Sequence, residues 1–511
     1  MVLPTATETR PEGTPPSRVP DEKVKKAGEE TVSVSNAIVA NFVPIIVARA
    51  FVAVLNGLYS QIASVEPLRQ LLSDAGASGP ALAGSAINLA PIAVSFLLAD
   101  FGSAVAVEAL SADGFWCSKP VLPDNLMPCV PRISVNRWAT SVILSGLVVV
   151  SAALVSVVAL WFKTPSRIAV ETTSISGVAM IMGHPQIEDD FRTIPTEMTN
   201  GQLALHLRDK RYTVGTFEAV NGIKYGMMPF DPSEDRHPSL LQRLERTAVE
   251  KRALFSLASW QRTRFKVDAV FAVFHLALLG LAIAALANVD HPRRIFTYTT
   301  RGRATAARVG ICLIGIVVSR YWGMLFRDAQ NLAPYARMHA RPSPAQGTIL
   351  KRGVGMPFFA IVPLARTGYA IPACVAVTAF VAEFFVVAVS GMPWRPGQLR
   401  GEYICCGAMC VVVLMVMLSI QGLVLYWRTT LPALPRRPDS VAAVMTYVAG
   451  TAMGREFHSV SGIGRKAADE VITEMGRRYA YGWRAEEGGA RRWVVDEVGM
   501  GYEGDGRTRV F

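Results

Sequence analysis

The feature that most limits the fold of this chain is a series of apolar runs of about 20 residues, each long enough to cross a hydrocarbon core of about 30 Å. A chain can satisfy its backbone hydrogen bonds inside a membrane only as a helix or in a closed barrel. The runs are continuous rather than alternating, which indicates helices. We expect seven transmembrane spans, at 38–58, 86–110, 140–162, 268–288, 308–327, 369–391 and 404–427.

Composition agrees with a membrane protein. The 511 residues are 51% hydrophobic and only 18% charged, against about 25% charged in an average soluble protein. The net charge of +12 would suit nucleic-acid binding, but no module of basic and aromatic residues accompanies it, so we expect no nucleic acid as a partner. In a multi-pass protein, Lys and Arg gather in cytoplasmic loops and near acidic lipids. The lipid bilayer is therefore the first partner expected.

A repeat relates the two halves of the chain. The segment Arg211–Tyr225 alternates and carries Asn-Gly at its middle, the strongest short-range signal of a β-hairpin. The segment Arg478–Arg492 has Arg, Tyr and two Gly at the same places, 267 positions later, and Gly-Gly at its turn. The apolar segments align at nearly the same shift. We therefore expect an all-α membrane protein with two parallel repeats, each followed by a small α+β soluble module that contains a hairpin.

The chain divides by composition into five parts. The start is rich in Pro, Thr, Glu and Lys, so we expect it to be disordered, without a cleaved signal peptide. A basic amphipathic helix at about 239–266 either lies in the headgroup layer or packs on the protein's own soluble module. The expected parts are a disordered segment at 1–35, a first membrane repeat with its hairpin module at 36–235, the amphipathic helix at 236–267, a connecting span and loop at 268–303, and a second repeat with its hairpin module at 304–511.

Seven spans place the two chain ends on opposite sides of the membrane and both hairpin modules on the same side. Basic residues near the membrane favour that side as the cytoplasmic one. Two of the seven cysteines, Cys117 and Cys129, share the loop at 109–139, which this topology places outside the cytoplasm. Thiols in an oxidising compartment can pair, so these two either form a disulfide or remain unpaired.

The sequence contains no pattern that indicates catalysis. It lacks a metal-ligand spacing of His, Cys or Glu, a nucleophile elbow and a phosphate-binding loop. We therefore expect no enzyme, no cofactor and no catalytic or metal-binding residue.

Ionisable residues inside expected spans are candidate functional residues by default. The main candidates are Asp100, His275, Arg320 and Glu383, and Arg49 and Glu108 also lie within expected spans. Such residues either line a path for an ion or proton, or pair one helix with another. Asp100 corresponds to Arg366 in the second copy, so the polarity is not kept between the copies, which favours helix pairing.

Three sequence features together resemble a known family. They are the segment Tyr321–Phe326 running into Ala333-Pro334-Tyr335, the apolar region Pro357–Gly391, and Arg437-Pro438-Asp439-Ser440. They are similar to a large family of multi-pass membrane proteins of filamentous fungi, known only as a domain of unknown function and often carried twice. The resemblance extends over most of residues 36–500 and implies a fungal integral membrane protein, but no active site. This chain departs from the doubled pattern of the family at one place, because the counterpart of span 268–288 would fall on the polar residues 1–21.

Our leading hypothesis is a non-enzymatic scaffold or sensor in the plasma membrane or an endomembrane, with cytoplasmic protein partners of the hairpin modules. The alternative is a transporter or channel that uses the interior of the helix bundle, because parallel repeats of helical units build many transporters. A membrane enzyme is a distant third hypothesis.

Overall fold

The computed structural model describes ten segments and a few isolated positions. They are residues 173–195, 198–208, 210–219, 222–229, 260–288, 301–392, 400–432, 434–461, 463–485 and 491–498, with 77–78, 145, 152 and 156. The expected spans at 38–58, 86–110 and 140–162 lie outside the described residues, apart from the three isolated positions in the last one. The disordered segment expected at 1–35 also lies outside them, as does the amphipathic helix up to residue 259.

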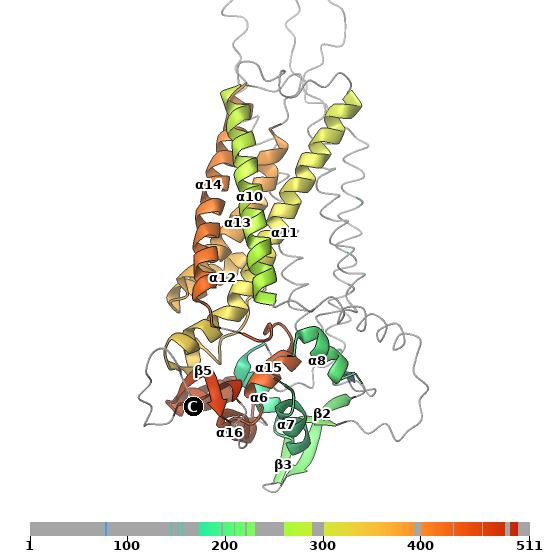
Figure 1. Cartoon of the computed structure of the whole chain (residues 1–511), viewed down its shortest axis with the longest axis vertical. Helices are drawn as coiled ribbons and strands as arrows, with labels where there is room; N and C mark the ends of the chain where they lie inside the picture. Colours follow the sequence, from blue (N-terminus) through green and yellow to red (C-terminus); the bar gives the residue numbers. More distant parts are fainter. Residues whose placement is uncertain are drawn as a thin grey trace, which may run out of the picture.

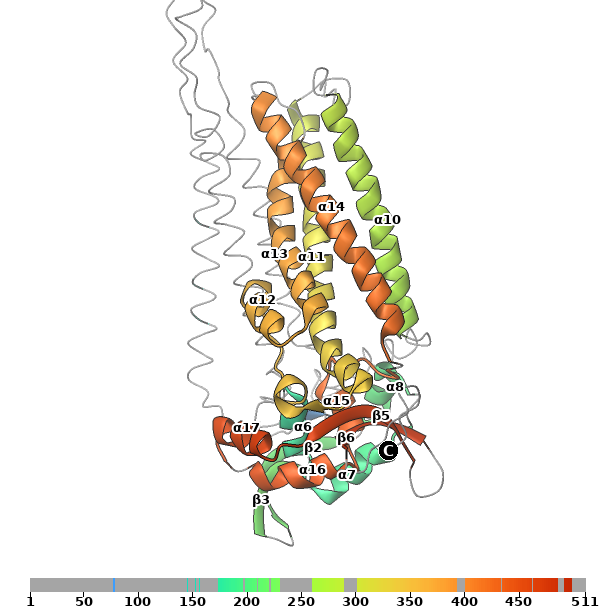
Figure 2. The same cartoon turned by 90° about the vertical axis from the view of Figure 1, so that its left-hand side faces the viewer.

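Four helices form an elongated bundle (Figures 1 and 2). They are α10 (Trp260–Ala287), α11 (Arg301–Ala340), α13 (Ala370–Ser390) and α14 (Arg400–Thr430). Among the described residues, these four helices are long and apolar enough to cross a membrane. They correspond to the expected spans at 268–288, 308–327, 369–391 and 404–427. The helix α10 begins at Trp260 and runs without a break through the residues that we assigned to the end of the amphipathic helix.

The bundle packs small residues inside and exposes large apolar residues outside. Helix α11 packs on α13, α10 packs on α14, and α13 packs on α14. Buried alanines line these contacts, among them Ala376, Ala379 and Ala382. On α10, by contrast, Val270 and Val273 are about two-thirds exposed, at 66% and 68%. Close approach of helices through small residues, with large side chains turned outward, is typical of helix association in lipid.

The helix α11 differs from the expectation. We expected its span to end near residue 327, but the helix continues to Ala340 with Pro334 inside it. Proline inside a helix removes one hydrogen bond and normally destabilises the helix. Here Leu332, Tyr335 and Met338 are buried in the core of the soluble part, and this burial offsets the cost.

Two soluble modules lie at one end of the bundle (Figure 1). The first module contains α6 (Ile175–Ile181), α7 (Pro185–Arg192), α8 (Asn200–His206), β1 (Ala77–Ser78), β2 (Arg211–Ala219) and β3 (Gly222–Pro229). The second module contains α15 (Val441–Val448), α16 (Ala452–Phe457), α17 (Arg465–Glu474), β4 (Ser343–Pro344), β5 (Arg478–Ala485) and β6 (Arg491–Glu497), with the 3-10 helices η3 (Ala345–Gly347) and η4 (His458–Val460).

Both expected hairpins are confirmed. In each module the hairpin forms an antiparallel sheet with a two-residue strand from far away in the sequence, in the orders β1-β2-β3 and β4-β5-β6. In the first hairpin, Ala219 pairs with Gly222, which has φ 107. The pairing therefore places Gly222 at the start of β3, whereas we expected this glycine to lie in the turn. The short helices begin in the same way, because Ser174 and Ser440 cap α6 and α15 by accepting hydrogen bonds from Gly177 N and Ala443 N.

The two modules share one hydrophobic core and contact each other reciprocally; we call them the module pair. Helix α6 packs on α15 and α16, while α15 also packs on α7. A Cβ at Gly183 would lie 1.9 Å from the His458 ring, and a Cβ at Gly450 would lie 3.4 Å from Arg192. Gly183 and Gly450 are 267 positions apart in the sequence, and each lies against a side chain from the opposite module. The shared core also places both modules at the same end of the bundle.

Candidate functional site

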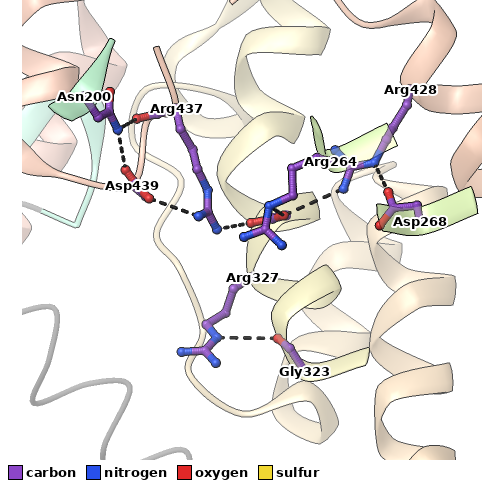
Figure 3. A network of polar contacts seen from close by, with 9 residues as sticks. Asn200, Arg264, Asp268, Gly323, Arg327, Arg428, Arg437 and Asp439 are labelled. Carbon is purple, nitrogen blue, oxygen red and sulfur yellow. Dashed lines mark hydrogen bonds and ion pairs between the residues drawn. The ribbon is translucent and has the colours of Figure 1, made fainter. Parts of the chain in front are cut away.

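Charged side chains, three of them buried, gather where the bundle meets the module pair (Figure 3). Six ionisable residues from α10, α11, α14 and the segment after α14 make a continuous chain of ion pairs, which we call the junction network. Its members are Arg264, Asp268, Asp328, Arg428, Arg437 and Asp439. Three arginines face three aspartates, so the network has no net charge when all six are ionised. Buried charges are tolerated in proteins when they are paired in this way.

Helical spacing brings these residues to common faces. Arg264 and Asp268 are four residues apart on α10, and Gln421 and Arg428 are seven apart on α14. Residues separated by one or two helical turns lie on the same face of a helix. Tyr321 and Asp328 are likewise seven apart on α11. Three polar faces therefore meet at the end of the bundle that faces the modules.

Asp268 joins the three helices. Its side chain is 2% exposed and forms an ion pair with Arg428 of α14. Its Oδ1 accepts a hydrogen bond from the Tyr321 hydroxyl of α11 at 2.9 Å. Gln421 Nε2 donates to the backbone oxygen of Asp268 at 2.8 Å. Removing any one of these partners would leave a buried polar group without compensation, so the arrangement fixes the helices relative to each other.

Asp328 connects the bundle to the modules. Its carboxylate, also 2% exposed, lies 3.6 Å from Arg264 Nε and 3.7 Å from Arg428 Nη2, and it forms an ion pair with Arg437. Arg437 lies after α14 and pairs in turn with Asp439 at 3.2 Å.

The chain of contacts ends in the first module. Asn200, the first residue of α8, donates to Asp439 Oδ1 at 3.0 Å and to the backbone oxygen of Arg437 at 3.0 Å. Burial raises the pKa of Asp439, and the charge of Arg437 partly offsets this effect.

The segment after α14 is held on several sides. The Trp260 indole donates to Leu434 O at 3.0 Å, and Gln261 Nε2 donates to Pro432 O at 3.0 Å, so the first turn of α10 contacts this segment. Arg436 is buried and donates to the backbone oxygens of Met198 and Pro195 in the first module. Burial lowers the pKa of Arg436 to about 10. The segment from Leu431 to Ser440 thus links the bundle to both modules.

The last turns of α11 form a second connection. Tyr335 packs against Tyr447 and Tyr481 of the second module, with ring centroids 5.6 and 5.4 Å apart. His339 Nδ1 lies 3.2 Å from Tyr481 O. One helix therefore contributes to the bundle core near Trp322 and to the module core near Tyr335.

The candidate residues that we predicted inside the spans do not form one site. His275 is buried in α10, with Nδ1 2.7 Å from Phe271 O, and its Nε2 accepts from the Trp322 indole at 3.3 Å. Glu383 on α13 accepts from the Ser319 hydroxyl at 2.7 Å. Arg320 is partly buried on α11. The contacts of His275 and Glu383 pair neighbouring helices. Asp100, Arg49, Glu108, Cys117 and Cys129 lie outside the described residues.

Sequence reasoning missed the junction network. Asp268 is the first residue of the span expected at 268–288, and Arg428 directly follows the span expected at 404–427, so neither was a candidate inside a span. The signal that could have revealed them is their spacing, because Arg264, Asp268 and His275 share one face of α10. Arg437 and Asp439 both belong to the segment Arg437-Pro438-Asp439-Ser440, one of the features that carry the family resemblance.

The described residues contain no group of three or more His, Cys, Asp or Glu side chains placed to hold a metal ion. Within this same part of the chain, Cys312, Cys374, Cys405, Cys406 and Cys410 form no disulfide with one another.

Residues 305–394 match a family described as "Protein of unknown function (DUF3433)". The matched segment covers α11 from its second turn, the short helix α12 (Pro357–Arg366) and all of α13. It contains two of the three sequence features that carry the resemblance noted above. No match was found among curated proteins or among solved structures. Over residues 305–394, the chain is thus similar to a family of unknown function.

Proposed function

We propose that the protein is a non-enzymatic integral membrane scaffold or sensor, in which the module pair binds cytoplasmic proteins and the bundle anchors and orients it. The observation that carries this proposal is the continuity of α11, which contributes to the cores of both the bundle and the module pair. The junction network adds a second, electrostatic connection beside it. A displacement of one helix would therefore change the contacts of the modules, which is what a sensor requires.

The polar residues of the bundle support this proposal over a transporter or channel. His275 and Glu383 are occupied by contacts between neighbouring helices, and Asp268 pairs with Arg428. A transport path needs polar groups that can exchange these contacts for an ion or substrate. The transporter remains the alternative that the experiments below distinguish.

The proposal also includes the topology that we inferred from sequence. We infer seven spans in two parallel repeats, with the modules in the cytoplasm, in a fungal multi-pass membrane protein. The common strand order of the two sheets and the equivalent positions of Gly183 and Gly450 support the duplication.

Coupling can be tested by hydrogen exchange on the full chain in lipid nanodiscs. The variant Arg437→Gln removes the residue that joins Asp328 to Asp439, and Arg455→Gln on the exposed face of α16 removes the same charge away from the junction. We expect Arg437→Gln to raise amide exchange in residues 198–208 and 434–461, whereas Arg455→Gln does not. Unchanged exchange in those module segments would contradict the coupling.

Scaffold and transporter make opposite predictions for a second pair of variants. Glu218→Lys changes an exposed side chain on the first hairpin, and Glu383→Gln neutralises the carboxylate inside α13. A scaffold predicts that Glu218→Lys weakens capture of protein partners crosslinked in cells, while Glu383→Gln has no effect on capture. A transporter predicts that Glu383→Gln abolishes flux in vesicles, while Glu218→Lys leaves flux intact.

A further inference from the structure

A short apolar helix lies beside the module-facing half of α13 (Figure 2). This helix, α12, spans Pro357–Arg366 and is too short to cross a membrane. Ala360 and Leu364 are buried on its inner side, whereas Phe358, Phe359 and Val362 are 56%, 63% and 54% exposed. The outer side of α12 is therefore an apolar surface at the level where the bundle meets the modules.

The backbone around α12 is suited to contact with lipid. A non-helical backbone is tolerated near hydrocarbon only when its polar groups have partners. Before the helix, Val354 N donates to the Gln330 side chain of α11 at 3.1 Å. After the helix, the Thr367 hydroxyl donates to Pro363 O at 2.8 Å, and Gly368, at φ 77, donates to Ala365 O.

Two cations converge on the turn between α12 and α13. Lys351 Nζ lies 3.2 Å from the centroid of the Tyr369 ring, and Arg337 Cζ lies 5.2 Å from it. Arg337 Nη1 donates to Thr367 O at 2.7 Å. Lys351 Nζ is buried, and within the described part of the chain it has no hydrogen-bond partner and neither cation forms an ion pair with a carboxylate. Among the described residues, this positive charge therefore meets the Tyr369 ring and a backbone oxygen but no carboxylate.

Burial, and to a smaller extent the charge of Arg337, lower the pKa of Lys351 to about 7. An anion placed beside the two cations would remove the repulsion between them.

We propose that the turn at Thr367–Tyr369 binds the phosphate headgroup of an acidic phospholipid, whose acyl chains lie against Phe358, Phe359 and Val362. The headgroup supplies the negative charge that Arg337 and Lys351 lack. The acyl chains cover an apolar surface that adjoins α13, where the rings of Phe358 and Phe380 lie 5.2 Å apart between centroids. A soluble phosphate would satisfy the cations but leave this surface uncovered, so the lipid fits both observations. An acidic lipid at this level belongs to the leaflet that faces the modules.

Lipid titration of the purified full chain tests the proposal. Dioleoyl phosphatidylserine and dioleoyl phosphatidylcholine are added to the protein in detergent, and bound lipid is measured by native mass spectrometry. The test variant is Arg337→Gln/Lys351→Gln. The control, Arg455→Gln/Lys466→Gln, loses the same charge from exposed positions on α16 and α17. We expect the wild type and the control to prefer phosphatidylserine, and the test variant to bind it about thirtyfold more weakly, as the loss of two cations near an anionic surface implies.

Further variants guard against an effect of misfolding. Lys351→Arg keeps the charge and is expected to keep the preference for phosphatidylserine, while Lys351→Gln alone reduces it. Phe359→Ser is expected to weaken binding of both lipids. Equal phosphatidylserine affinity in the wild type and Lys351→Gln would overturn the proposal. Complete displacement of phosphatidylserine by inorganic phosphate at the same concentration would also overturn it, because the turn would then be a site for a soluble anion.

Discussion

Asp328 is the residue whose loss should affect the structure most. Its carboxylate is 2% exposed and forms ion pairs with three arginines, which are Arg264 at 3.6 Å, Arg428 at 3.7 Å and Arg437. At these distances each pair interacts by about 4–5 kcal/mol when the effective dielectric constant is about 20. The desolvation of the charges offsets much of this gain, but removal of one partner of a buried pair typically costs about 3–5 kcal/mol, because the remaining charges stay buried. We therefore expect Asp328→Asn to destabilise the protein by about 3–5 kcal/mol.

The matched control is Asp469→Asn. Asp469 pairs with Arg352 in a similar ion pair, but its side chain is 30% exposed. Exposed pairs contribute about 0–1 kcal/mol, so this variant should be almost neutral. Thermal unfolding of the full chain in detergent, followed by tryptophan fluorescence, measures both. We expect a midpoint roughly 5–10 °C lower for Asp328→Asn, and almost no shift for the control.

A double-mutant cycle with Arg437→Gln separates the network from a local effect. The two residues are in contact, so the cost of Asp328→Asn should fall by about 0.5–3 kcal/mol in the Arg437→Gln background. Equal shifts for Asp328→Asn and Asp469→Asn, or strict additivity with Arg437→Gln, would refute the electrostatic role of the junction.

Three other measurements test the module pair and the topology. Gly183→Ala should destabilise the protein by about 1–3 kcal/mol in thermal unfolding, because the new Cβ would overlap the His458 ring. The control Gly464→Ala should not, because a Cβ at Gly464 would meet nothing within 4 Å. Equal unfolding midpoints for the two variants would exclude the close contact at Gly183. Burial lowers the pKa of His458 in the folded protein below its ordinary value of 6.5. The unfolded chain therefore binds the proton more tightly than the folded protein does. As a result, the contribution of neutral His458 to stability is complete above pH 6.5 and is lost as the pH falls below 6.5. The slope of the midpoint between pH 7.5 and 5 should be shallower in His458→Gln, and an unchanged slope would assign the effect to other groups. Single cysteines introduced by Ser118→Cys and Ser459→Cys should be labelled from opposite sides of sealed vesicles, whereas labelling from the same side would exclude seven spans.

The spans and hairpins could be predicted because their signals are local. A continuous apolar run identifies α10, α13 and α14 without knowledge of their neighbours, and the alternation around Asn-Gly identifies β2 and β3. The end of α11 could not be predicted in this way. Its last turns carry Pro334 and polar residues, and they remain helical because Tyr335 and Met338 are buried by residues more than a hundred positions later.

The candidate site was harder to predict for the same reason. Pairings such as Asp328 with Arg437, or β1 with β2, join segments that no local pattern relates. His275 and Glu383 stood out because charges are rare inside apolar runs, and their contacts pair helices. Asp268 and Arg428 did not stand out because they lie at the ends of such runs, yet these ends meet at the junction network.

Because both modules belong to one polypeptide, the contact between them forms without an encounter between separate molecules. A tether of this kind gives an effective concentration on the order of millimolar, whatever the abundance of the protein in its membrane. Dilution therefore does not separate the modules, and every copy presents the two in a fixed ratio of one to one. The two halves differ in sequence, so each outer surface can acquire its own ligand while the buried contact between them is kept.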